Sequence, residues 1–481
     1  MEGSVDSAEE EALRADVMVE ANNDAEEQQF DIALAASHSY MGPSLETGSG
    51  RGRARVEAGW EGRVPVMAHH GIVFPGETVP MLFTEDVDIL SEAIQQDKLF
   101  GLLCPDEGGA ALSGYGVLCE VYEVLAAPAG VQRRSPSPPL VSFKARATHR
   151  FRCRQLPRRA LTAHAFDRLR FMDVRVLPDV RLADPLRAAR LAALDPLRAE
   201  DERAVRLRSM DAALTPWPLF VYEIFDFRRM RRTIRDYFKT LGIDDVPEDA
   251  VTLSHWTASN LALTPRDRLA LFVVDDALLR LHMEVGFIME KSVLCCAACE
   301  VEIARREQIF AMSTEGVHSN YINLGGFVHD VVTVSSVRNT RLSGAPSAEY
   351  SWFPGYEWTV AVCAMCHAHV GWRFEACRRN LRPQQFYGLC RNAVHPRFSP
   401  ARAAPPGAQR PPRPPRHHLD PDLLIVEYFV SELGRYAARH APDRAPDGAP
   451  NLAPDLASDH APDDAPDDES DHSPPDSPPA Q

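Results

Sequence analysis

Two cysteine pairs with C-x-x-C spacing could bind a metal ion. They are Cys296-Ala-Ala-Cys299 and Cys363-Ala-Met-Cys366. Each turn of this type holds two thiolates at about the separation that one tetrahedral Zn²⁺ requires, and two turns complete a closed structural site. The segment between the pairs is longer than in a simple zinc ribbon, so β structure must bring the two turns together. The prediction is one structural zinc ion.

Buried thiols or a thioredoxin-like redox pair are the alternatives. A redox pair begins a helix in a βαβ unit, whereas Val360-Ala-Val precedes Cys363 as a strand-like run and a second C-x-x-C is present. Zinc is therefore favoured. Cys295 has no partner at this spacing and is left out of the predicted site.

A second candidate site consists of aromatic residues around the second cysteine pair: Trp352, Trp358, Trp372 and Phe374. Tryptophan is usually explained by core packing. However, residues 291–398 offer little volume for three indoles, and Ser351-Trp-Phe-Pro-Gly-Tyr-Glu-Trp is typical of a loop. An aromatic box of this kind binds a methylated ammonium through cation–π attraction or a flat neutral ring by stacking. The residues alone leave both ligands open.

The elements that must position these residues predict an α+β, multidomain fold class. Residues 61–182 contain short β-type runs punctuated by Gly and Pro, with one helix near 84–96. Residues 183–290 change to helical periodicity, with Asp and Thr-Pro signals at helix starts. Residues 291–398 combine cysteine pairs, Gly and aromatics, which indicates a β-rich zinc domain.

Both termini are acidic and of low complexity. Residues 1–31 contain eleven Asp or Glu against Arg14, and residues 440–481 contain eleven against Arg444, within a formal net charge of −16. Residues 1–60 and the Pro- and Asp-rich tail, 399–481, are expected to be disordered because they offer little apolar surface to bury. An amphipathic stretch at 422–439 is the tail's one candidate for order.

The charge distribution also excludes classes of function and suggests a location. The body between the acidic ends is nearly neutral, which argues against a nucleic-acid surface. No run of eighteen apolar residues is present and the N-terminus is acidic, so we expect no membrane span or secretory signal, and a location in the cytoplasm and nucleus.

Several motifs together resemble the cereblon family. In the zinc region the resemblance rests on Asn323-Leu-Gly-Gly-Phe-Val-His, on Ser351 to Cys363, on His369-Val-Gly-Trp-Arg-Phe and on Pro383-Gln-Gln-Phe-Tyr-Gly-Leu, which are similar to its thalidomide-binding (CULT) domain. Upstream, Phe30-Asp, Ser37-His-Ser-Tyr-Met-Gly and Val64 to Phe83 resemble its N-terminal segment and Lon-like β domain. The similarity covers residues 30–398.

The resemblance implies a substrate receptor of a cullin-4 RING ubiquitin ligase that has no catalytic residues of its own. The helical residues 183–290 would dock on the adaptor damaged-DNA-binding protein 1. The zinc domain would capture substrates that carry C-terminal cyclic imides, and would bind thalidomide-type glutarimides. Carried over residue by residue, the ligand-binding set is Asn323, Tyr350, Trp352, Trp358, Trp372 and Phe374. Backbone groups at Tyr350 and Trp352 would meet the imide N–H and carbonyls.

Two positions depart from the family pattern. Tyr350 stands where the family usually has His, and Asn323-Leu-Gly-Gly-Phe327 replaces an Asn-Pro-His-Gly-Tyr loop. The expected backbone contacts do not depend on these side chains, whereas a side-chain hydrogen bond and closure of the loop do.

Three other functions were compared. For a Lon-type protease the chain would need a G-x-x-x-x-G-K-[ST] loop, which its sequence does not contain. Its four lysines also offer no plausible Ser–Lys dyad. A methionine-sulfoxide reductase shares the two cysteine knuckles and would need a nucleophile in the aromatic pocket, for which Cys377 is the nearest candidate. A methyl-lysine reader would need acidic residues at the box, and Glu349 and Glu357 keep that function open.

Overall fold

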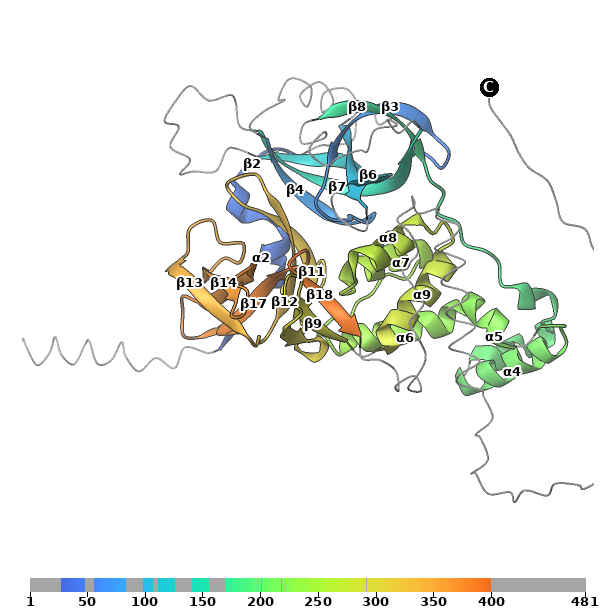
Figure 1. Cartoon of the computed structure of the whole chain (residues 1–481). Coiled ribbons are helices and arrows are strands. Elements are labelled where there is room, and N and C mark those ends of the chain that lie inside the picture. The colour runs from blue at the N-terminus through green and yellow to red at the C-terminus, as the bar shows by residue number, and fades with distance from the viewer. Residues whose placement is uncertain are drawn as a thin grey trace, which may run out of the picture. The chain divides into compact units, whose positions relative to one another are not determined.

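The computed structural model describes residues 27–47, 56–83, 98–106, 111–125, 141–154, 169–199, 201–217, 219–290 and 292–398 (Figure 1). These residues belong to one compact unit, Met1–Val426. The helix predicted at 84–96, the tail from 399 and the candidate helix at 422–439 lie outside them. Helices and several separate sheets confirm the predicted α+β, multidomain class. No helix in the described ranges is long and apolar enough to cross a membrane.

The Lon-like region forms a closed β sheet. Its strand order is β2-β6-β5-β3-β8-β7-β4, and a further β6–β7 pairing closes the ring. Alternating apolar residues such as Val64, Val66 and Phe151 pack inside it. Gly116 is needed there because a Cβ at this position would lie 2.4 Å from the Leu102 carbonyl oxygen and 2.5 Å from the Phe151 ring. The strands are β2 Ser44–Thr47, β3 Glu61–Ala68, β4 Thr78–Phe83, β5 Leu99–Pro105, β6 Leu112–Leu125, β7 Val141–Cys153 and β8 Arg170–Val176.

The helical region contains α4 to α9, with short 3-10 turns before and between them. Side chains of Asp226, Asp249, Thr264 and Asp276 cap the N-termini of α6 to α9. The bounds are η4 Pro185–Ala188, η5 Ala192–Ala199, α4 Asp201–Ala213, α5 Leu219–Tyr222, η6 Glu223–Phe225, α6 Phe227–Lys239, α7 Ala250–Asn260, α8 Pro265–Val273 and α9 Ala277–Met289.

The helical run from Leu269 to Met283 is divided in the structure. α8 ends at Val273, and Asp276 caps the new helix α9 by accepting from the Leu279 N–H at 2.8 Å. The break has a structural partner, because Arg150 on β7 donates to the Phe272 carbonyl at 2.7 Å and pairs with Asp275 at 3.1 Å. This fully buried arginine joins the barrel to the helices.

The zinc region contains two sheets. A three-stranded sheet has the order β10-β9-β18, and a six-stranded antiparallel sheet has the order β11-β12-β17-β15-β14-β13. The strands are β9 Ser292–Cys296, β10 Glu302–Arg305, β11 His318–Ile322, β12 Val328–Val334, β13 Thr340–Ser347, β14 Tyr356–Cys363, β15 His369–Ala376, β16 Leu381–Arg382, β17 Gln385–Cys390 and β18 Val394–Phe398, with η7 at Arg306–Gln308.

Residues 27–47 are ordered, which corrects the expectation of a disordered segment over residues 1–60. They form β1 (Gln28–Gln29), α2 (Ile32–Ala36), η2 (Ser39–Met41) and β2. β1 pairs in parallel with β16, and Phe30 packs edge-on against Phe353 and Tyr356 in the zinc-domain core. Composition missed this order because Phe30 is buried against residues more than 300 positions away, rather than against its neighbours in sequence.

Candidate metal centre and ligand pocket

The four predicted cysteines meet at one point. Cys296 and Cys299 lie at the end of β9 and in the turn after it, and Cys363 and Cys366 lie in the same way after β14. All four Sγ atoms are within 4.8 Å of one another, with 3.6 Å between Cys296 and Cys366 and 3.5 Å between Cys299 and Cys363. A tetrahedral ion with Zn–S bonds of about 2.3 Å needs sulfurs about 3.8 Å apart. The four thiols therefore fit one zinc ion.

The two turns share one backbone pattern. The residue after each second cysteine, Glu300 or His367, has a positive φ, and its N–H donates to the carbonyl of Cys296 or Cys363, at 2.9 and 3.0 Å. Burial raises the pKa of the Cys296 thiol, and backbone N–H groups oppose this effect. At Cys363 burial acts in the same direction, but the N–H groups of Cys366 and Met365 bring the pKa down to about 7. Such donors stabilise metal-bound thiolate.

The metal centre and the aromatic pocket share a strand. β14 ends in Cys363 and also carries Trp358 and Val360, whose side chains line the pocket. Trp358 lies opposite Phe374, and Val360 opposite Trp372, in the β14–β15 register. An ion at the cysteines would fix one end of β14 and, through this register, the separation of the pocket walls.

All six predicted ligand-binding residues line one cavity of about 380 Å³. Trp352 and Trp372 meet nearly at right angles, with ring centroids 4.7 Å apart and planes at 75°. Phe374 is buried below them and stacks on Phe386 at 5.1 Å. The lining residues that sequence reasoning left out of the ligand set are Leu324, Gly325, Glu349 and Val360.

In two of the three indoles, the N–H group donates a hydrogen bond within the protein. Trp352 Nε1 donates to the Ile322 carbonyl at 3.1 Å, and Trp358 Nε1 donates to the Glu349 carbonyl at 2.9 Å. Trp352 also stacks on Tyr321 at 5.1 Å with planes 11° apart. These two walls therefore offer a ligand their flat faces rather than N–H donors.

Tyr350 occupies the position where the sequence departs from the family. Its φ is +53°, and its ring packs edge-on against Tyr40 of the N-terminal segment, with centroids 5.0 Å apart. Its hydroxyl is buried without a hydrogen-bond partner, and burial raises the pKa of Tyr350 to about 12. Tyr40 is anchored in turn, because its hydroxyl accepts from the Ile322 N–H at 3.1 Å. Through Tyr40, residues 27–47 therefore pack against a residue that lines the pocket.

The second departure, the loop from Asn323 to Phe327, is a tight turn. Asn323 Oδ1 accepts from the Phe327 N–H at 2.9 Å, and the Gly326 N–H donates to the Asn323 carbonyl at 3.0 Å. Phe327 stacks on His70 of the Lon-like region at 4.4 Å. Without the family's Pro and His, this loop is held by its own asparagine and by a histidine from another domain.

The geometry bears on the rival functions. Cys377, the candidate nucleophile of a reductase, is exposed and does not line the cavity. Of the two acidic residues that a methyl-lysine reader would use, Glu349 lines the pocket. Glu357, on β14, lies opposite Glu375 on β15 and does not line the pocket. One carboxylate is therefore available to a cation in the pocket, and no thiol.

Two family models match the chain. One is described as the substrate-binding domain of ATP-dependent protease La (LON) and covers residues 63–290, which includes both the β barrel and the helices. The other is described as Yippee zinc-binding/DNA-binding and Mis18, centromere assembly, and covers residues 292–397. The zinc-binding model and the cysteine cluster agree on one structural zinc ion, as predicted.

Curated relatives decide the family. A Danio rerio protein named "Protein cereblon" is 30% identical over 392 residues, which are 76% of this chain and 88% of the relative. The chain belongs to the cereblon family. A Xenopus tropicalis cereblon is 28% identical over 394 residues, and a Drosophila grimshawi cereblon is 32% identical over 381.

Coverage differs among these cereblons. The match spans 85% of the Xenopus protein, but 54% and 59% of two Drosophila proteins, so the chain covers little more than half the length of some relatives. Family membership confirms the resemblance drawn from the Trp and Cys motifs. Activity, substrates and partners are taken up as proposals.

Proposed function

We propose that this cereblon-family protein is a non-catalytic substrate receptor of a cullin-4 RING ubiquitin ligase, and that it binds C-terminal cyclic imides in the tryptophan pocket. The observation that carries this proposal is the pocket itself. Its walls are indole faces, and Trp352 and Trp358 have their N–H groups bonded within the protein. A flat, neutral ring suits such walls, because it buries both faces and needs few polar partners at its rim.

Glu349 supports a second candidate function, a methyl-lysine reader, because a carboxylate beside three indoles also suits a methylated ammonium. The two functions differ in the ligand's charge and in its need for an N–H donor. Titration with matched ligands separates them, as set out in the Discussion.

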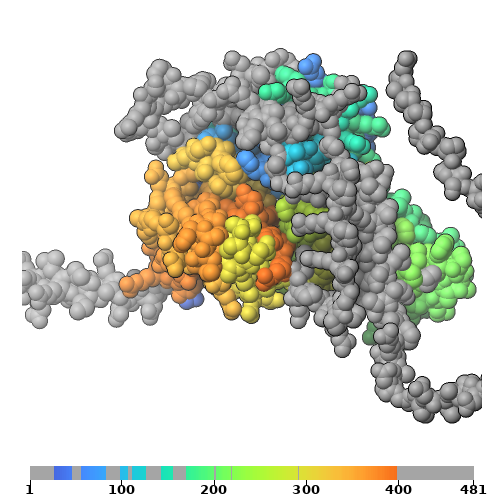
Figure 2. Space-filling model, viewed as in Figure 1, coloured from blue at the N-terminus to red at the C-terminus, as the bar shows by residue number. Residues whose placement is uncertain are grey.

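The proposed docking surface for damaged-DNA-binding protein 1 is formed by exposed apolar side chains of the helical region. Six large apolar side chains between residues 191 and 217 are 43–72% exposed: Leu191, Leu197, Val205, Met210, Leu214 and Trp217. Within residues 215–235, Trp217 is exposed, whereas Tyr222, Met230 and Ile234 are buried. In the space-filling view of Figure 2, residues of the helical region are coloured green and lie at the surface. Large apolar side chains that stay exposed in this number favour a protein partner.

We expect the triple variant Val205→Asp, Leu214→Asp, Trp217→Asp to lose the adaptor, with affinity falling at least about tenfold, because exposed anchors of this kind dominate interfaces. The measurement is co-purification of the adaptor and cullin-4 from cells. Phe171→Asp, at an exposed apolar residue on β8, is the matched control and should keep both partners. Normal co-purification by the triple variant would remove this surface from the proposal.

Removal of residues 440–481 should change neither zinc content nor imide affinity. This segment carries eleven acidic residues in an Ala-Pro-Asp repeat, which cannot build a core. Elemental analysis and an imide titration of the shortened protein against the whole chain provide the check. A loss of either property would show that the tail supports the zinc domain.

The Tyr350→His substitution should strengthen imide binding or leave it unchanged. It restores the family's residue without changing the backbone contacts, and it removes a buried hydroxyl that has no hydrogen-bond partner. Isothermal titration of the whole chain with a glutarimide measures the effect. A marked loss of affinity would mean that the contact between Tyr350 and Tyr40 holds the pocket in shape.

The same proposal places the protein in the cytoplasm and nucleus, which fractionation of cells expressing the tagged chain would test.

A further inference from the structure

The rim of the tryptophan pocket carries a single charged side chain. Among the ten described residues that line the cavity, Glu349 alone is charged, and the lining contains no Lys, Arg or His. Trp352 and Phe374 are buried in the inner part of the cavity, whereas Glu349 and Leu324 are exposed. A carboxylate and an aliphatic side chain therefore lie together at the mouth.

The backbone of Glu349 is fixed, whereas its carboxylate is not. Its N–H donates to Ser347 Oγ at 3.1 Å, and its carbonyl accepts from Trp358 Nε1 at 2.9 Å. Within the part of the chain that the structure describes, the carboxylate itself makes no ion pair or hydrogen bond. The negative charge at the rim therefore remains available to a ligand.

Charged residues on the neighbouring strands do not line the cavity. Arg373 pairs with Glu375 at 2.7 Å, and Arg341 on β13 lies opposite Val362, toward the zinc end of β14. Glu357, on the same strand, is a further carboxylate outside the lining. The charge that a ligand meets at the mouth is therefore that of Glu349.

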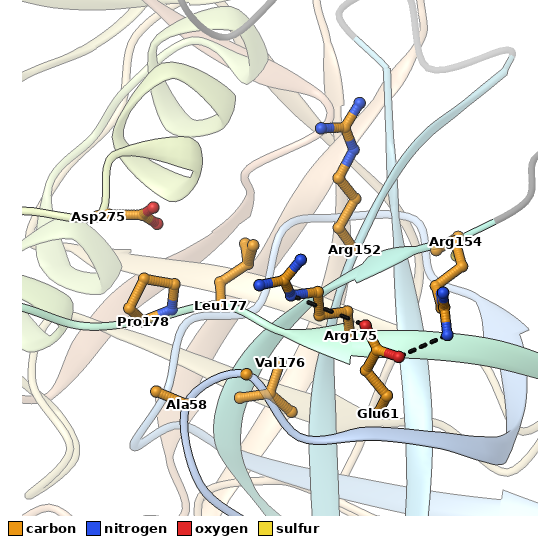
Figure 3. A pocket seen from close by; sticks show the side chains of 11 residues that line it. Ala58, Glu61, Arg152, Arg154, Arg175, Val176, Leu177, Pro178 and Asp275 are labelled. Carbon is orange, nitrogen blue, oxygen red and sulfur yellow. Dashed lines mark hydrogen bonds and ion pairs between the residues drawn. The ribbon is translucent and has the colours of Figure 1, made fainter.

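A cleft at the edge of the barrel shows the opposite arrangement. It has a volume of about 790 Å³ and is lined by three arginines and two acidic residues. Figure 3 shows Glu61 interacting with Arg154 and Arg175, at 2.5 and 4.0 Å. The other acidic residue, Asp275, pairs with Arg150 at 3.1 Å. Both carboxylates of this cleft are paired within the protein, unlike the carboxylate of the tryptophan pocket.

The side chain that suits the mouth of the tryptophan pocket has an aliphatic stem and a cationic head. Leu324 is 43% exposed and offers apolar contact to methylene groups, while Glu349 attracts an ammonium or guanidinium group. The indole of Trp358 adjoins Glu349 and adds cation–π attraction. Lysine and arginine combine both properties, whereas an acidic side chain would be repelled.

We propose that the pocket selects substrates with a lysine or arginine directly before the C-terminal cyclic imide. This inference rests on the proposed function, in which the indole walls hold the ring. The residue before the ring is then the first to leave the cavity, so its side chain meets the exposed rim. Glu349 is the specificity-determining residue for that side chain.

Calorimetry of the whole chain with three synthetic peptides tests this selectivity. Each peptide ends in the same aminoglutarimide, and the residue before it is lysine, norleucine or glutamate. We expect the lysine peptide to bind about threefold to tenfold tighter than the glutamate peptide, with norleucine between them, as for an exposed charge pair. The difference should shrink as salt rises to about 1 M, where the screening length falls to about 3 Å.

The variant Glu349→Gln should lose the advantage of the lysine peptide over the glutamate peptide. Glu357→Gln, which removes a carboxylate outside the cavity, is the matched control and should keep that advantage. Equal Kd values for the two peptides on the unchanged protein, or a lysine preference that survives Glu349→Gln, would overturn the inference and leave the imide receptor standing.

Two further outcomes bear on the proposed function as well. If none of the three peptides binds, the imide receptor is refuted and the inference with it. A fourth peptide has the lysine but ends in a plain amide in place of the imide, and it should bind far more weakly. Equal affinity for this peptide and the lysine imide would show that the pocket recognises the cation alone.

Discussion

The substitution Cys363→Ser should unfold the zinc domain and release its metal. Cys363 contributes one of four thiols that lie within 4.8 Å of one another, and its strand also carries two pocket residues. Binding of structural zinc contributes on the order of 10 kcal/mol to the free energy of folding. This is comparable to the whole free energy of unfolding of a typical domain, so its loss should unfold this one. We expect zinc per chain to fall from one to near zero, with loss of the near-ultraviolet signal of the domain's tryptophans.

The Lon-like and helical residues should survive this change. Barrel and helices have buried residues of their own, such as Val66 and Leu281, so a protease-resistant fragment close to 63–290 should remain. Cys377→Ser is the matched control, because Cys377 is an exposed cysteine of the same domain outside the cluster. A folded domain without metal in the Cys363→Ser protein, or no zinc in the unchanged protein, would rule out the structural site.

Loss of a pocket tryptophan should weaken imide binding without releasing zinc. For Trp358→Ala and Trp372→Ala we expect a loss of about 1–3 kcal/mol, because each indole supplies a stacking face and buried apolar area. Trp352→Ala should also weaken binding. That residue is buried and donates to Ile322, so its effect includes distortion of the pocket. Trp217→Ala, at an exposed tryptophan of the helical region, is the control.

The ligand itself provides the sharper test. N-methylation of a glutarimide should abolish binding, because it removes the donor and leaves a buried carbonyl acceptor unpaired. The titration compares the glutarimide, its N-methyl analogue and trimethyl-lysine on the same protein. Equal affinity for the two imides would refute the proposed backbone contact, and preference for trimethyl-lysine would replace the imide receptor with a methyl-lysine reader.

These titrations need the whole chain rather than residues 291–398 alone. Phe30 packs into the zinc-domain core, and Tyr40 supports Tyr350 at the pocket. A protein that begins at residue 291 would lack both contacts. The domain boundary that the sequence suggests therefore leaves out part of the site.

Local patterns predicted the metal ligands and the aromatic walls. In a C-x-x-C turn the chain geometry between neighbouring residues holds two thiols close together, so Cys296, Cys299, Cys363 and Cys366 could be assigned from spacing alone. The run from Ser351 to Trp358 concentrated aromatic residues in a short segment, and the motifs around it identified the family. Such features depend on residues close in sequence, or on side chains whose type restricts their chemistry.

Other features depended on contacts between distant residues. The β14–β15 register places Val360 opposite Trp372, and the turn at Asn323 brings Leu324 and Gly325 to the same cavity. Residues 27–47 are ordered because they pack on a domain far along the chain. A cleft of the helical region likewise forms from residues spread between Arg181 and Arg232. Spacing and composition describe neighbours in sequence, whereas these sites are set by strand pairing and packing across long separations, which only the tertiary structure decides.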